Sequence, residues 1–165
     1  MPISERFADA LNAQVGREYA AAHQYTAIAA WYDAETFPRL SKFFYDQAEE
    51  EREHARKMTD YLLETGQQVR LGEVAAPIND FPDHVEPIRH ALEQEKRVTV
   101  EIDRLVEIAR ETRDNASEIF LQWFVSEQVE EEDSIASLLH VAERVRDFPM
   151  MVEEFLARDG KTLAD

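Results

Sequence analysis

Four separate stretches of the sequence share one feature: a glutamate stands where an apolar helical face should continue. In each stretch, large apolar side chains recur at spacings of three and four residues, which is typical of the buried side of an α-helix. The second stretch also has a histidine three residues after its glutamate, so the two side chains are neighbours on one face. The interrupting residues are Glu18, Glu51, His54, Glu95 and Glu131.

The chemistry of such a set is that of a cation site. A buried carboxylate is costly unless a positive charge offsets it, and no lysine or arginine falls on these predicted inward positions. Four ionised glutamates are neutralised by two divalent cations. Oxygen ligands with a single imidazole suit iron or manganese better than zinc, which favours nitrogen or sulfur. The spacing therefore predicts a dinuclear centre, and iron is the expected metal.

A simpler interpretation applies to each glutamate alone, because a helical face inferred from one sequence is easily misassigned. The same exception in four helices, with Glu51 and His54 at ligand spacing, favours the metal site. Tyr25 and Trp123 fit ordinary core aromatic residues, and Gln128 lies on the predicted inward face of the fourth helix. Further acidic residues lie one position off the inward faces, where a solvated surface is the default interpretation: Glu50, Glu127 and Glu130.

Composition excludes several classes of function. The chain has 165 residues and a formal net charge of −17, and its lysines and arginines form no basic stripe, so neither nucleic acid nor a membrane is an expected partner. It has no cysteine, which excludes disulfides, zinc–thiolate sites, iron–sulfur clusters and a cysteine nucleophile. No apolar run is long enough to span a membrane, and the N-terminal segment lacks the pattern of a secretory signal, so we expect a cytoplasmic protein.

Five helices must position these residues. The periodicity predicts one all-α domain over residues 1–165, with helices at about 4–33, 37–65, 84–113, 116–146 and 148–159. The first four are long enough to form a four-helix bundle. The interval between the second and third helices has no helical period and contains Gly72, Pro77 and Pro82. Its length predicts a crossover that leaves these two helices parallel.

The fifth helix is short and has one apolar side, formed by Met151, Val152, Phe155 and Leu156, and Gly160 should end it. A bundle whose core is already closed offers this side no obvious partner. We therefore expect the fifth helix to pack against other copies of the chain. Folding back onto its own bundle is the alternative.

With these residues in place, the sequence resembles bacterial non-haem ferritins from about Phe7 to Gly160. The resemblance rests on Glu18-Tyr-Ala-Ala-Ala-His-Gln-Tyr25, Ala48-Glu-Glu-Glu51-Arg-Glu-His54-Ala, Glu95, and Phe120-Leu-Gln-Trp-Phe-Val-Ser-Glu127-Gln128-Val-Glu130-Glu131. It implies a ferritin-like four-helix bundle with ferroxidase activity, which oxidises Fe(II) with dioxygen. It also implies that the Fe(III) mineral is stored in a hollow homo-oligomer of roughly 24 subunits.

The resemblance also assigns roles to individual residues. The implied ligands of one iron are Glu18, Glu51 and His54, and those of the second are Glu51, Glu95 and Glu131, with Glu51 bridging the pair. Gln128 is implied to form hydrogen bonds within the site, and Tyr25 to act as an electron donor beside it. A third iron position is implied by the acidic set Glu50, Glu127, Glu130 and Glu131.

Two departures separate the chain from the related bacterioferritins. These repeat Glu-x-x-His on the fourth helix, where this sequence has Gln128-x-x-Glu131, and they ligate haem with a methionine where it has Arg52. Haem is therefore not an expected cofactor. Three alternatives stay open: a storage subunit without ferroxidase chemistry, a bacterioferritin-like protein, and a helical interaction protein without metal. Asp114 and Glu118 match the position of channel acids, with a helix-capping or surface role as the alternative.

Overall fold

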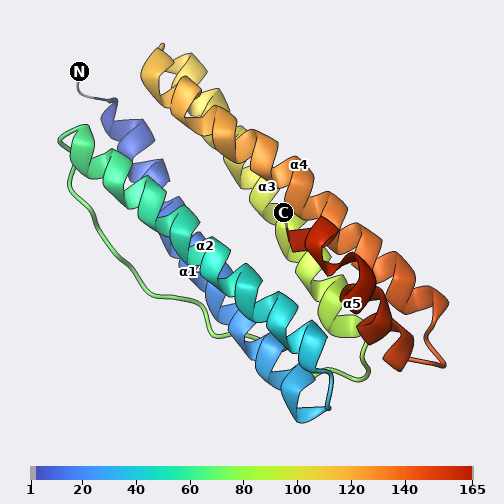
Figure 1. Cartoon of the computed structure of the whole chain (residues 1–165). Coiled ribbons are helices and arrows are strands. Elements are labelled where there is room, and N and C mark those ends of the chain that lie inside the picture. The colour runs from blue at the N-terminus through green and yellow to red at the C-terminus, as the bar shows by residue number, and fades with distance from the viewer. Residues whose placement is uncertain (1–2, 165) are drawn as a thin grey trace.

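The computed structural model describes the backbone of residues 3–164 and the side chains of residues 3–158. In this part of the chain it contains five α-helices and no β-strand (Figure 1). The helices are α1 (Glu5–Ala34), α2 (Pro38–Glu64), α3 (Glu86–Glu111), α4 (Asn115–Arg144) and α5 (Met150–Ala164). The all-α prediction is confirmed, and the ends of the first four helices differ from the expected ones by one or two residues. No helix of the described chain is both long and apolar enough to cross a membrane.

The long helices form two antiparallel pairs, α1 with α2 and α3 with α4 (Figure 1). Residues 65–85 connect α2 to α3 along the length of the bundle, so these two helices run in the same direction, as the crossover prediction requires. The connection is held against α1 by side chains of that helix. Gln24 exchanges two hydrogen bonds of 2.8 Å with the backbone of Ile78, and Asn12 bonds to the backbone nearer the start of the connection.

A layer of polar side chains divides the bundle core into two apolar clusters. Each long helix contributes to both clusters and passes from one to the other at a polar position. In α1, for example, Val15 belongs to one cluster and Tyr25 to the other. The buried polar residues at these changes are Glu18 in α1, Glu51 and His54 in α2, Glu95 in α3, and Gln128 and Glu131 in α4. Apolar packing above and below therefore fixes the level at which the polar side chains meet.

The fifth helix packs onto its own bundle through Val152 and Leu156, so the expectation that its apolar side contacts other copies is wrong for these two residues. Val152 and Leu156 are buried in the same apolar cluster as residues of α2 and α4. The Glu153 carboxylate accepts hydrogen bonds of 3.0 and 3.2 Å from the backbone N–H groups of Arg39 and Leu40. It thereby caps the N-terminus of α2, whose own N-cap residue forms no side-chain capping bond. The expectation failed because this end of the bundle leaves both apolar surface and backbone donors for α5 to cover.

Other residues around the start of α5 stay exposed. Phe148, Met150 and Met151 have exposed fractions of 70%, 59% and 51%. The helix also continues through Gly160, where the sequence predicted its end, to Ala164. A helical glycine lowers stability by about 1 kcal/mol relative to alanine, which weakens a helix without necessarily ending it.

The acidic residues near the start of α4 have local roles. Asp114 accepts a hydrogen bond of 3.0 Å from the backbone N–H of Ser117, so it caps α4. Glu118 forms an ion pair of 2.7 Å with Arg110 on α3. These contacts support the capping and surface interpretation of the two residues.

Candidate metal centre

All the residues predicted to face inward are buried within one level of the bundle. Glu18 and Glu51 are each 1% exposed and Glu95 is fully buried. The exposed fraction is 4% for the remaining members of the set, His54, Gln128 and Glu131. The prediction from the apolar periodicity that these polar side chains face the core is therefore confirmed.

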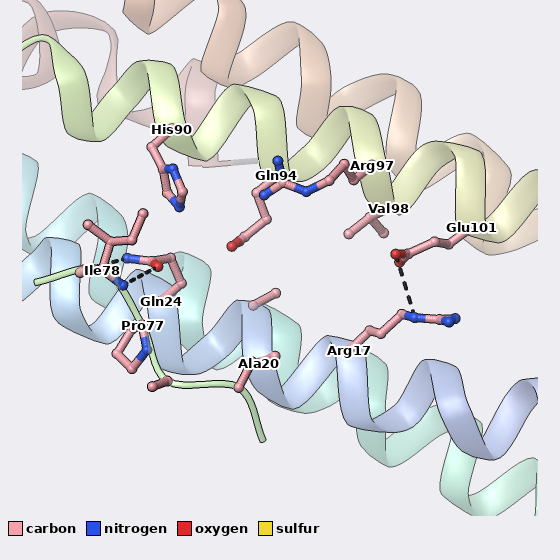
Figure 2. A pocket seen from close by; sticks show the side chains of 13 residues that line it. Arg17, Ala20, Gln24, Pro77, Ile78, His90, Gln94, Arg97, Val98 and Glu101 are labelled. Carbon is pink, nitrogen blue, oxygen red and sulfur yellow. Dashed lines mark hydrogen bonds and ion pairs between the residues drawn. The ribbon is translucent and has the colours of Figure 1, made fainter. Parts of the chain in front are cut away.

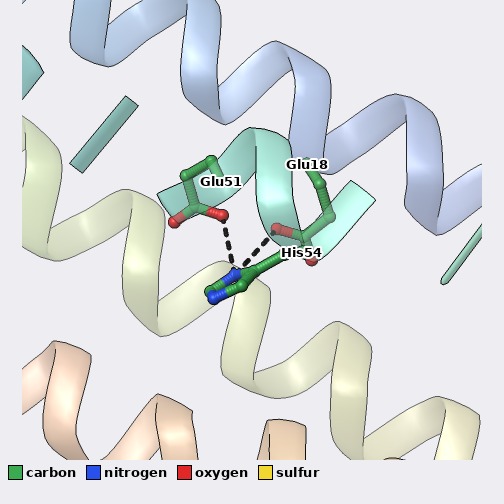
Figure 3. A group of neighbouring side chains, drawn as sticks. All are labelled: Glu18, Glu51 and His54. Carbon is green, nitrogen blue, oxygen red and sulfur yellow. Dashed lines mark hydrogen bonds and ion pairs between the residues drawn. The ribbon is translucent and has the colours of Figure 1, made fainter. Parts of the chain in front are cut away.

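Three of these residues form a compact group between α1 and α2. His54 Nδ1 lies 3.2 Å from Glu51 Oε2 and 3.9 Å from Glu18 Oε2 (Figure 3). One ligand atom from each residue lies within 4.8 Å of the other two. Two carboxylates and one imidazole at this separation are suited to share one metal ion.

A second group connects the buried site with the surface of α4. Ligand atoms of His54, Glu127 and Glu131 also lie within 4.8 Å of one another, and Glu127 is only partly buried. Glu50 adjoins Glu131 and contributes to the rise of its pKa, whereas Glu130 is exposed. The structure thus brings together three of the four residues predicted for a third iron position, with Glu130 at the edge of the group.

Glu95 stands apart from both groups because its two carboxylate oxygens already accept hydrogen bonds. The Tyr25 hydroxyl donates to Oε1, and the Gln128 amide donates to Oε2 over 3.1 Å. The Gln128 amide also donates to the backbone oxygen of Glu95 over 3.2 Å. Each carboxylate oxygen has two lone pairs, so these bonds orient Glu95 and leave it able to bind a metal.

Several carboxylate oxygens at the centre are buried with no hydrogen-bond partner among the described residues. They are Glu18 Oε2, Glu51 Oε1 and Glu131 Oε2. No described lysine or arginine forms an ion pair with these three residues or with Glu95; His54 is their charged partner when protonated. An unpaired buried acceptor is destabilising, and more so when it carries charge. The residues present therefore fit divalent cations.

Burial and mutual repulsion favour the protonated form of most of these carboxyls when no metal is bound. Burial, reinforced by the nearby charge of Glu95, raises the pKa of Glu51 well above its usual value. Burial and the hydrogen bond with Glu50 raise the pKa of Glu131 to about 10. Burial also raises the pKa of Glu95 despite its hydrogen bonds. A bound cation reverses this preference, because it favours the ionised carboxylate.

Glu18 and His54 behave as an ion pair within this set. Burial alone would raise the pKa of Glu18, but the neighbouring His54 and Glu51 side chains and the hydrogen bond from Gln14 outweigh burial and lower it. Burial alone would lower the pKa of His54, but the adjacent Glu18 carboxylate and the other acidic charges nearby raise it. These opposite shifts favour the charged forms of Glu18 and His54 in the metal-free site.

Two neighbours of the site, Gln14 and Lys57, were not predicted from the sequence. Gln14 is fully buried and donates a hydrogen bond of 3.0 Å to Glu18 Oε1. Its position four residues before Glu18 was the available signal, since residues at that spacing share a helical face. Trp123 packs edge-on against His54 with ring centroids 5.4 Å apart, and Lys57 Nζ lies 3.1 Å from the centre of the Trp123 ring.

A separate hollow of about 320 Å³ lies between α1, α3 and the crossover (Figure 2). Its lining includes Gln24, Ile78, Gln94, Arg17 and Glu101, and none of the predicted metal ligands. Arg17 and Glu101 form an ion pair at the edge of the hollow, with Arg17 Nε 3.6 Å from Glu101 Oε1. The hollow is therefore a feature of the bundle surface, distinct from the carboxylate site.

Comparisons with known proteins agree with this fold. Residues 8–145 match the family model described as a ferritin-like domain. The chain is 36% identical to ferritin BfrB of Mycolicibacterium smegmatis over 157 residues, which cover 95% of this chain and 87% of that protein. It is 39% identical to a bacterial non-haem ferritin of Staphylococcus aureus over 145 residues, covering 88% and 87% of the two chains.

A solved structure extends the likeness to three dimensions. An open-pore ferritin from Archaeoglobus fulgidus matches with a TM-score of 0.88 and 34% sequence identity, covering 92% of this chain and 96% of that one. Similarity in sequence and in structure thus extends over nearly the whole bundle. The chain belongs to the ferritin family of iron-storage proteins.

Proposed function

We propose that the chain oxidises Fe(II) with dioxygen at the buried carboxylate site and stores the Fe(III) as a mineral inside a hollow homo-oligomer in the cytoplasm. The observation that carries this proposal is the set of buried oxygens of Glu18, Glu51 and Glu131 that have no hydrogen-bond partner among the described residues. Such oxygens are costly in an empty protein interior and favourable beside divalent cations.

Two iron ions are the proposed substrates of this site. The first binds Glu18, Glu51 and His54, whose ligand atoms already lie within 4.8 Å of one another. The second binds Glu51, Glu95 and Glu131, with Glu51 as the bridge. The free Oε1 of Glu51 supports the bridging role, because Oε2 is the oxygen directed at His54. Gln128 orients Glu95 through its amide hydrogen bond.

The proposed reaction transfers two electrons to dioxygen. Each Fe(II) loses one electron, and dioxygen takes both electrons together with two protons. Two iron ions at one site avoid the one-electron step that would release superoxide, and carboxylate ligands stabilise Fe(III) over Fe(II). Tyr25, whose hydroxyl contacts Glu95, is the proposed electron donor when only one Fe(II) is bound, so that dioxygen still receives two electrons.

A third iron position lies on the route between this site and the surface of α4. Glu127 and Glu131 supply its best-supported ligands, since both lie within reach of His54. Glu50 adjoins Glu131, and Glu130 raises the local acidic charge beside Glu127. We propose that iron passes through this position on its way into or out of the oxidation site.

The proposed assembly is a closed shell of roughly 24 subunits. Storage of a mineral requires a cavity that one four-helix bundle does not enclose. Phe148, Met150 and Met151 leave an exposed apolar patch where α4 meets α5. Patches of this kind mark contacts between subunits, so we propose that this end of the molecule joins neighbouring copies.

Aerobic addition of Fe(II) to the metal-free protein tests the catalytic proposal. The wild type should oxidise iron rapidly, as followed by ferric absorbance, while Glu18→Ala and His54→Ala should approach the rate of buffer alone. Glu53→Ala is the matched control, because Glu53 is exposed on the same helix as His54 and should leave the rate unchanged. Equal rates for all four proteins would reject the site.

The oxidation assay and a haem titration distinguish the alternative functions. A storage subunit without ferroxidase chemistry would take up Fe(III) but show the buffer rate of oxidation in the wild type. A bacterioferritin-like protein would bind haem, which we do not expect, because Arg52 occupies the relevant position and is engaged with Glu49 and Thr26. Titration with haem, followed by its absorbance, distinguishes that case.

A further inference from the structure

We infer that Gln14 is a positioning residue that holds one oxygen of Glu18 and so presents the other oxygen to the metal; the identity of the metal rests on the proposed function. Gln14 is fully buried in α1, one helical turn before Glu18. Its Nε2 donates to Glu18 Oε1 over 3.0 Å. Glu18 Oε2 has no hydrogen-bond partner among the described residues and lies 3.9 Å from His54 Nδ1. The two oxygens of Glu18 therefore differ: Oε1 accepts a hydrogen bond from Gln14, and Oε2 is left for the metal.

The orientation of the Gln14 amide is fixed by contacts outside the metal site. Its Nε2 also donates to Glu101 Oε2 over 3.2 Å, and its Oε1 accepts a hydrogen bond of 3.2 Å from Arg17 Nη1. If the amide were turned over, its oxygen would face two carboxylates and its NH₂ group would face a guanidinium. Repulsion on both sides excludes that arrangement.

Gln14, Arg17 and Glu101 contact one another through hydrogen bonds and an ion pair, and we call these three residues the Gln14 network. Arg17 Nε lies 3.6 Å from Glu101 Oε1 at the edge of the surface hollow (Figure 2). Glu101 belongs to α3, whereas Gln14 and Arg17 belong to α1. The Gln14 network therefore spans two helices. It links the partly exposed Arg17–Glu101 ion pair to Glu18, the buried proposed metal ligand.

Hydrogen bonds to metal ligands commonly set their orientation, and losing one typically weakens metal affinity by about 10-fold to 100-fold. Gln14→Leu keeps the approximate volume of the side chain and removes its three hydrogen bonds. Without them, Glu18 is free to rotate or to turn both oxygens towards His54. We expect a weaker site for the first metal ion and a changed coordination geometry.

Gln24→Leu is the matched control. Gln24 is also a buried glutamine of α1, 6% exposed, and its two hydrogen bonds hold the crossover at Ile78 and do not reach the metal ligands. Both variants lose buried amide hydrogen bonds on the same helix, so both should lower the stability of the metal-free protein. Only Gln14→Leu should change metal binding.

The experiment titrates Co²⁺ into the assembled, metal-free protein, because the visible spectrum of Co²⁺ reports its coordination geometry independently of iron oxidation. Gln14→Leu should weaken binding of the first Co²⁺ by at least about tenfold and alter its spectrum, while Gln24→Leu should match the wild type. In oxidation assays, Gln14→Leu should raise KM for Fe(II) more than it lowers kcat. Glu101→Gln, at a partly exposed position, should shift affinity in the same direction by a smaller factor and serves as the test if Gln14→Leu fails to fold.

Each result bears on the inference. It is overturned if Gln14→Leu binds Co²⁺ with wild-type affinity and spectrum, or if both glutamine variants lose affinity equally. If Gln14→Leu does not fold, wild-type Co²⁺ binding by Glu101→Gln overturns it. Failure of the proposed oxidation is a separate result: in that case the wild type binds Co²⁺ and Gln14→Leu weakens binding, but neither oxidises Fe(II) faster than buffer.

Discussion

The substitution Glu131→Gln should stabilise the metal-free protein at neutral pH while it weakens metal binding. Glu131 is 4% exposed, and its pKa is raised to about 10 by burial and by its hydrogen bond with Glu50. In the unfolded chain the same carboxyl returns to a pKa near 4.5. Between these two values the folded protein holds a proton that the unfolded chain has lost, so stability falls as the pH rises.

The size of the effect follows from the two pKa values. Each pH unit within this window costs about 1.36 kcal/mol of unfolding free energy. pH 7 is about 2.5 units above the pKa of the unfolded chain, so at this pH Glu131 lowers the free energy of unfolding of the metal-free protein by about 3 kcal/mol. Glutamine does not ionise, and it retains an N–H donor for Glu50. The stability gain of the variant over the wild type should grow by roughly 4 kcal/mol between pH 5 and pH 8.

Chemical denaturation of the metal-free wild type and variant at pH 5 and pH 8 measures this difference. The amide of the variant does not titrate, so the free-energy cost of burying it is the same at both pH values and cancels when the stability differences at pH 5 and pH 8 are compared. Glu130→Gln is the matched control, since Glu130 is an exposed neighbour on the same helix, and it should show no such growth. A gain that does not change with pH, or a variant less stable than the wild type at pH 8, would refute the reasoning.

Three further predictions concern proton release from the site, the Tyr25 hydroxyl and the cap of α2. Binding of Co²⁺ to the metal-free protein at pH 7 should release protons, detectable with a pH indicator, because the pKa of Glu131 is raised to about 10 and those of Glu51 and Glu95 are shifted in the same direction; no release would contradict those shifts. Tyr25→Phe removes the hydroxyl that contacts Glu95 and should slow iron oxidation by about tenfold in stopped-flow measurements, with stability lowered by about 1 kcal/mol because a buried acceptor loses its donor; an unaltered rate would exclude its role. Glu153→Ala removes the cap of α2 and should lower the unfolding free energy by about 1 kcal/mol in denaturant titrations without changing Co²⁺ affinity; unchanged stability would contradict the capping role.

Most of the fold was predictable because the helices are long and strongly periodic. Apolar spacing located α1 to α4, and the length of the connection before α3 indicated the crossover. The packing of α5 was not predictable in the same way. Val152 and Leu156 look equally suited to another subunit or to the same bundle, and the uncovered N-terminus of α2, which Glu153 caps, arises only once the helices are assembled.

The inward position of the site residues was predictable for a related reason. A glutamate such as Glu18 that interrupts an apolar stripe must face the core if the helix keeps its register. Contacts between helices were beyond the sequence, because periodicity within one helix does not specify which residue of another helix it meets. The bond between Gln14 of α1 and Glu101 of α3 is such a contact. The hydrogen bonds that occupy both oxygens of Glu95 are others.

Anomalous diffraction from crystals soaked with Fe(II) under anaerobic conditions tests the central claim most directly, that the buried carboxylates form a dinuclear iron site. Two strong peaks should appear inside the bundle, one bound by Glu18, Glu51 and His54 and the other adjoining Glu51 and Glu131. A weaker peak near Glu127 would mark the third position. Peaks confined to exposed acidic residues, with none inside the bundle, would contradict the account.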